Sequence, residues 1–128
     1  MKKELVSLPD AKFEVMNAVW KCGAVGVSTV EVMNELQTAK KNQTVLTMLT
    51  RLADKGFLSS EKNGKERVWT AQVSEEEYRS FEAKKIVDEV YGGSFAGLVS
   101  AFYDGKGISD AEARELLALI EKELGRKE

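Results

Sequence analysis

The sequence contains no histidine, a single cysteine and a single proline. Without histidine, a histidine general base, a Ser–His–Asp triad and a Cys–His pair are all impossible. A zinc site built from cysteine and histidine is excluded in practice, so we expect neither a metal nor another cofactor. Cys22 follows Trp20 near the end of an apolar helix. A small, half-buried side chain is favoured there over a reactive thiol.

Long apolar runs are absent as well. No stretch approaches the ~18 apolar residues of a membrane span, and Lys2 and Lys3 are not followed by the apolar segment of a signal peptide. We therefore predict a cytoplasmic protein with no membrane insertion. Paired carboxylates, a glycine-rich phosphate loop and a nucleophile–base pair are also missing, which argues against an enzyme.

Charge is unevenly distributed along the 128 residues, whose net charge is −2. Residues 1–73 carry 11 Lys/Arg against 8 Asp/Glu, whereas residues 74–128 carry 8 against 13. Between Leu36 and Arg67 there are seven basic and three acidic residues. An acidic protein with a basic front half is compatible with binding a polyanion on one face.

The front half has the patterns of three helices. Apolar residues at helical spacing predict helices over about 10–21 and 42–55, the first capped by Gly23. A short extended link over 24–27 leads to the second helix, which begins with a capping box formed by Ser28 and Glu31.

Two strands follow these helices. The strands are predicted over 57–62 and 65–73, around the dipeptide Asn63-Gly64. Asn-Gly is typical of a two-residue hairpin turn in which both residues adopt positive φ. Three helices and a hairpin give the order of a winged helix-turn-helix, in which the third helix enters the DNA major groove and the hairpin contacts flanking DNA.

The remaining residues are predicted to be helical. Capping boxes occur at 74–77 and 109–112, and a short helix is predicted over 94–103. We therefore predict a mainly α protein with a small β-hairpin. A winged helix-turn-helix DNA-binding domain spans 1–73 and a helical dimerisation domain spans 74–128.

The last two helices each carry an apolar stripe. About 55 residues in three helices cannot bury two such stripes within one subunit, so we predict a homodimer on a palindromic operator. The predicted dimerisation residues are Phe95, Leu98, Val99, Phe102, Leu116, Leu117, Ile120 and Leu124.

The third helix and the hairpin supply the candidate DNA-binding residues. Gln and Asn side chains pair with adenine, while threonine methyls and Leu46 pack on thymine methyls. Basic side chains contact phosphates, among them Lys55 beside the third helix. The predicted DNA-binding residues are Lys41, Asn42, Gln43, Thr44, Leu46, Thr47, Thr50, Arg51, Lys65 and Arg67. The alternative is a protein-binding winged helix that never contacts DNA, which the acidic Asp54 favours.

Four segments resemble the penicillinase/methicillin-resistance repressor family: residues 13–20, 44–58, 90–99 and 108–112. The resemblance implies a homodimeric transcriptional repressor of antibiotic-resistance genes whose partner is a double-stranded DNA operator. It also implies inactivation in response to a β-lactam. In the family that the sequence resembles, a membrane-bound sensor metalloprotease leads to cutting of the repressor within the helix that corresponds to 94–103, and the resemblance implies that the cut bond here is Ala101–Phe102.

The sequence departs from the family pattern at three places. Lys41-Asn42-Gln43 stands where family members often have Ser-Pro, and Leu46 stands where some have a basic residue. The Cys-x-Cys pairs of the copper-responsive branch are absent after Cys22, so direct metal sensing is not expected. A repressor of the same family with a different, non-proteolytic inducer is the second alternative.

Overall fold

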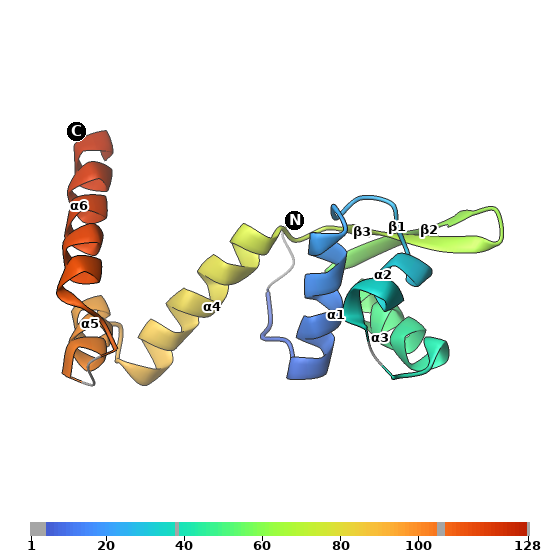
Figure 1. Ribbon diagram of the computed structural model, residues 1–128, viewed down its shortest axis with the longest axis horizontal. Helices are drawn as coiled ribbons and strands as arrows, with labels where there is room; N and C mark the ends of the chain where they lie inside the picture. The colour runs from blue at the N-terminus through green and yellow to red at the C-terminus, as the bar shows by residue number, and fades with distance from the viewer. Residues whose placement is uncertain (1–4, 38, 105–106, 128) are drawn as a thin grey trace. The chain divides into compact units, whose positions relative to one another are not determined.

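The computed structural model describes residues 5–37, 39–104 and 107–127 (Figure 1). The helices and strands, in chain order, are α1 (Asp10–Lys21), β1 (Val27–Ser28), α2 (Thr29–Leu36), α3 (Asn42–Asp54), β2 (Leu58–Asn63), β3 (Glu66–Ala71), α4 (Glu75–Val90), α5 (Phe95–Asp104) and α6 (Asp110–Lys127). The predicted fold class, mainly helical with a small sheet, is confirmed. The chain forms two compact units, of which the first ends at Glu82 and the second begins at Ala83.

The core of the first unit lies between α1, α2 and α3 and a three-stranded antiparallel sheet of order β1-β3-β2. Trp69, in the central strand, is buried, and its indole Nε1–H donates to Thr29 Oγ1 over 3.1 Å. The largest fully buried side chains are those of Val15, Met16, Val19, Val27, Val32, Val45, Leu49, Leu52, Phe57 and Trp69. The apolar faces predicted for the three helices therefore meet in one core.

The link between α1 and α2 differs from the prediction. Gly23 ends α1 with a φ of 101°, as its cap position requires, but Ala24 and Gly26 also have positive φ, at 69° and 61°. The link is therefore turned rather than extended, and its end forms β1, which pairs with Val68 and Trp69 of β3. Two residues are too few to show the alternation of apolar and polar side chains that identifies a strand in a sequence. This strand is identified only by its pairing with β3.

The hairpin turn is also corrected, by one residue. Asn63 pairs with Glu66, so the two-residue loop is Gly64-Lys65 and not Asn63-Gly64. Only Gly64, with a φ of 70°, is in the left-handed region, which is the pattern of a type II′ turn. The two possible turns differ by two residues in strand pairing, because an Asn63-Gly64 loop would pair Leu58 with Trp69, whereas Leu58 pairs with Ala71 here. A shift of two residues leaves every side chain on the same face, so Trp69 faces the core in both pairings and alternation along the strands does not predict which turn forms.

The first turns of α4 pack on the first unit. Tyr78 is buried, its ring centroid lies 5.8 Å from that of Phe13 and 5.8 Å from that of Phe57, and its hydroxyl accepts from the Leu8 amide over 2.8 Å. Phe81 lies against the same ring. The boundary between compact units therefore falls at 82–83, later than the predicted division at 73–74, because aromatic side chains of α4 complete the core of the first unit.

In the second unit, α5 and α6 enclose an apolar groove. Ser94 and Ser109 cap these helices through their hydroxyls, and Ser109 and Glu112 form the predicted capping box. The groove has a volume of about 690 Å³ and is lined by the apolar side chains of both helices. Tyr103 of α5 donates to Asp110 of α6 over 3.1 Å, and this bond raises the pKa of the Tyr103 phenol. None of the helices, over the residues described, is apolar and long enough to cross a bilayer.

Candidate nucleic-acid interface

The outward face of α3 is built from neutral polar side chains. Val45, Leu49 and Leu52 are buried on the inner face, which leaves Gln43, Thr47 and Thr50 exposed on the other. The Thr47 hydroxyl donates to the Gln43 carbonyl and the Thr50 hydroxyl to the Leu46 carbonyl, each over 2.9 Å. Because these donors are engaged by backbone, each threonine offers a partner a methyl group and a hydroxyl acceptor. This combination suits a thymine methyl or the exocyclic amine of adenine or cytosine.

The N-terminus of α3 is electropositive. Its first turn contains no acidic residue, and the N-cap residue, Lys41, makes no side-chain cap hydrogen bond. By contrast, α2 and α4 begin with the capping boxes predicted from Ser28 and Ser74, each closed by a glutamate. Without a carboxylate, the positive end of the helix dipole at α3 is not neutralised by its own side chains. The entry of this helix therefore favours an anionic partner.

Two side chains of α3 limit how it can meet DNA. Leu46 is half-buried against the core, so only part of it is available for the predicted contact with a thymine methyl. Asp54 is exposed on the outward side of the last turn, where its carboxylate repels phosphate. The first two turns of α3 are therefore the part suited to enter the major groove.

The strand register sorts the charges of the hairpin onto two faces. Lys62 pairs with Arg67 and Ser60 with Trp69, so by alternation Lys62 and Arg67 share the face of the buried Trp69. Glu61 and Glu66, one residue away from these cations in each strand, lie on the opposite face. Figure 1 shows β2 and β3 extending past α2 and α3. The hairpin therefore presents cations on the side of the helices.

Lys62 is a candidate contact that the sequence analysis missed. Strand alternation could have identified it, because Lys62 is two residues from Ser60 on the face that Trp69 marks. Arg67 is held over the sheet by a hydrogen bond from Nη1 to Ser60 Oγ over 2.9 Å, and Lys65 occupies the turn itself. The structure thus brings Lys62 and Arg67 together and leaves Lys65 at the tip.

Cys22 takes no part in this surface. Its thiol donates to the Glu31 carbonyl over 3.8 Å. Burial, followed by the negative charges of Glu35 and Glu31, raises the pKa of the thiol. A protonated thiol is a poor nucleophile and a poor metal ligand. No group of three or more potential ligands that could hold a metal ion occurs among the residues that the structure describes.

The predicted dimerisation residues lie in the second unit and form two sets. Phe95, Leu98, Val99, Phe102 and Leu116 line the groove between α5 and α6, as does Leu119. The other set, which we call the outer stripe, consists of Ala113, Leu117, Ile120 and Leu124. Leu117, Ile120 and Leu124 are 57%, 39% and 59% exposed. Their spacing of alternating four and three residues is that of a helix that packs along a second helix.

Comparisons with known proteins agree with this geometry. A family model described as "Penicillinase repressor" matches residues 8–122. The chain is 31% identical to the penicillinase repressor of Bacillus licheniformis, over 98% of each chain. It is 27% identical to the methicillin resistance regulatory protein MecI of Staphylococcus aureus strain N315, over 95% of this chain and 99% of that protein. The solution structure of the DNA-binding domain of the repressor BlaI matches 60% of this chain and 94% of that domain, with 35% identity and a TM-score of 0.51.

Proposed function

The chain belongs to the penicillinase repressor family, and we propose on that premise that it is a DNA-binding transcriptional repressor, acting as a homodimer on palindromic operators of resistance genes. The family predicted from the sequence is confirmed, and it is a family of repressors rather than enzymes. In this proposal the protein works in the cytoplasm, where bacterial DNA lies.

One observation carries the proposal: the exposed, uncharged face of Gln43, Thr47 and Thr50 on a helix whose N-terminus is not neutralised. Donor and acceptor groups on such a face distinguish base edges, whereas the cations around it bind the phosphates of any sequence. Lys41 and Arg51 lie beside this face on α3, and Lys62 and Arg67 lie on the face of the hairpin that bears the buried Trp69. Asn42 and Thr44 are exposed in the first turn of α3 and complete the proposed base-contacting set.

Replacing Thr47 tests the base-contacting face. We expect Thr47→Ala to cost roughly 1–3 kcal/mol in operator binding and to change binding to random duplex little. Thr47→Val keeps a methyl group and Thr47→Ser keeps the hydroxyl, so the pair separates thymine packing from hydrogen bonding. Gel shifts with the upstream region of the protein's own gene measure these affinities, and Gln43→Ala is expected to behave in the same way.

The matched comparison is Arg67→Gln in the hairpin. It is expected to weaken operator and random duplex by the same factor and to reduce the dependence of binding on salt. If Thr47→Ala bound the operator as tightly as the wild type, the assignment of the outward face of α3 to base contacts would be contradicted. A wild-type protein that binds no DNA would favour the alternative of a protein-binding module.

The outer stripe supports the homodimer. In a monomer the outer stripe leaves three large apolar side chains in contact with water, which is unfavourable. A second copy of the stripe, related by a twofold axis, would bury them. The open groove between α5 and α6 lies on another side of the same helix and leaves Phe95 and Phe102 half exposed. The second copy is therefore the proposed partner of this unit.

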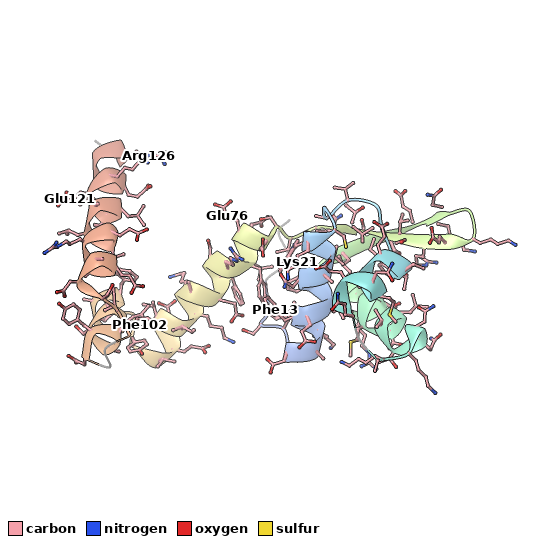
Figure 2. The ribbon with its side chains drawn as sticks, in the orientation of Figure 1. Phe13, Lys21, Glu76, Phe102, Glu121 and Arg126 are labelled. Carbon is pink, nitrogen blue, oxygen red and sulfur yellow. The ribbon has the colours of Figure 1, made fainter. Side chains whose placement is uncertain are left out.

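The proposed inactivation is a cut at Ala101–Phe102 in α5, by a membrane sensor protease that acts directly or indirectly. Both residues are exposed in the single subunit, Phe102 to 52% (Figure 2). Gly92 and Gly93, just before α5, have positive φ and interrupt the helical chain there. Short helices next to such interruptions open locally at low cost, which a protease requires.

Following the size of the protein by blot in its native host, after addition of a β-lactam, tests the cut. We expect a fragment to appear as target genes are induced, and Phe102→Asp to prevent it. Phe95→Asp, a matched change in the same helix, is expected to leave cutting intact. An intact band during induction would refute the proteolytic mechanism and favour a repressor with a different inducer.

A further inference from the structure

Three basic side chains meet at the interface between α1 and α3. Lys12 is half-buried on α1, and Arg51 and Lys55 are exposed at the end of α3, which packs directly on α1. The side chain of Lys12 lies within hydrogen-bonding reach of Lys55, and Arg51 is near enough to act on its charge. We call these three residues the basic cluster.

The basic cluster is not neutralised by the protein. Among the residues that the structure describes, none of its three members forms an ion pair with a carboxylate. The hydrogen bond with Lys55, some burial and the charges of Lys55 and Arg51 lower the pKa of Lys12. A hydrogen bond between two amines requires one of them to be uncharged, whereas an anionic oxygen accepts from both in their charged forms. The arrangement is therefore complementary to an anion.

The basic cluster lies to one side of the outward face of α3. With about 100° per residue, Arg51 and Lys55 lie roughly 60° to 100° round α3 from the centre of the outward face. Thr44, in the first turn, lies on the same flank. When the outward face of a recognition helix meets base edges, its flanks face the sugar–phosphate walls of the groove. The basic cluster lies on this flank at the end of α3, outside the part that enters the groove, where it faces the phosphates that border the groove. Asp54 lies on the outward face of the same turn and not on this flank.

We propose that Lys12, Arg51 and Lys55 form a phosphate-binding cluster that holds one operator strand, which makes α1 a DNA-contacting element beside α3 and the hairpin. The proposal rests on the proposed function and adds to it a contact from a helix that otherwise serves the core. Bound phosphate oxygens accept hydrogen bonds from Lys12 and Lys55 together and remove their mutual repulsion. Contacts of this kind fix register and affinity without selecting sequence.

The test is the full-length variant Lys12→Gln. We expect its affinity to fall by about 5- to 10-fold at 0.1 M salt, equally for operator and random duplex, and the slope of log K against log salt to fall by about one. Lys12→Arg keeps the positive charge and is expected to have the affinity and the salt dependence of the wild type. Lys21→Gln, at the other end of α1 from Phe13 in Figure 2, is the matched control and is expected to bind as the wild type does.

Measuring the stability of Lys12→Gln distinguishes a role of Lys12 in DNA binding from a role in holding the fold together. Because the basic cluster is repulsive in the free protein, we expect Lys12→Gln to unfold at the same or a higher urea concentration than the wild type. A variant that loses stability along with affinity would assign Lys12 a structural role and overturn the proposal. If Lys12→Gln bound DNA as the wild type does while Thr47→Ala lost affinity for the operator, phosphate binding by the basic cluster would be contradicted. The proposed repressor function would be unaffected. A wild-type protein without DNA binding would overturn both.

Discussion

Replacing both Leu117 and Ile120 by glutamate is expected to lower the affinity of the full-length protein for its operator by about 10²- to 10⁴-fold. In a dimer, binding of the first DNA-binding unit places the second at a high effective concentration over the other half-site. Two carboxylates on the outer stripe cannot be buried against two more from a second copy, so the dimer dissociates. The operator is then bound by two independent monomers, and the gain in affinity from the high effective concentration of the second DNA-binding unit is lost.

Light scattering and gel shifts check this result together. The double variant is expected to be a monomer at micromolar concentration and to bind an isolated half-operator as the wild type does. By helical spacing, Arg126 lies on the opposite side of α6 from the outer stripe, so Arg126→Glu changes charge away from the stripe. It is expected to leave the dimer and operator affinity intact. A wild-type protein that is already a monomer would contradict the dimer proposal directly.

Replacing Trp69 by alanine is expected to cost about 3–5 kcal/mol of unfolding free energy, a large part of the ~5–15 kcal/mol that a domain typically has. Trp69 is 1% exposed and lies in the central strand, paired with Val27 on one side and Ser60 on the other. Its removal leaves a cavity among β1, β2 and the helices. Urea unfolding followed by circular dichroism measures the loss.

The hydrogen bond of Trp69 is tested separately from its volume. Thr29→Val preserves the shape of the acceptor but leaves the buried indole N–H without the hydroxyl 3.1 Å away. We expect a smaller loss of about 1–3 kcal/mol. Val68→Ala, a neighbour on the opposite, more exposed face of β3, is the matched control for substitution in this strand. A Trp69→Ala variant as stable as Val68→Ala would show that the core does not depend on this side chain.

The α3 surface shows how much could be predicted from the sequence. Helical periodicity places Val45, Leu49 and Leu52 inward, and the same arithmetic turns Gln43 and Thr47 outward, because a regular helix fixes side-chain direction from spacing alone. Capping boxes at Ser28, Ser74 and Ser109 were predictable for a similar reason, since each bond joins residues three apart in the chain. Local rules thus determined the starts of α2, α4 and α6, the helix faces and the fold class.

Features that depend on contacts between distant residues required the tertiary structure. The pairing of Asn63 with Glu66, and with it the Gly64-Lys65 turn, does not follow from the Asn63-Gly64 dipeptide. Only packing reveals that Tyr78 extends the first unit into α4. Lys12 lies close to Lys55 although the two are 43 positions apart in the sequence. Periodicity determines which way a side chain points, but which side chains meet is decided by how the elements pack, because that choice depends on the whole core.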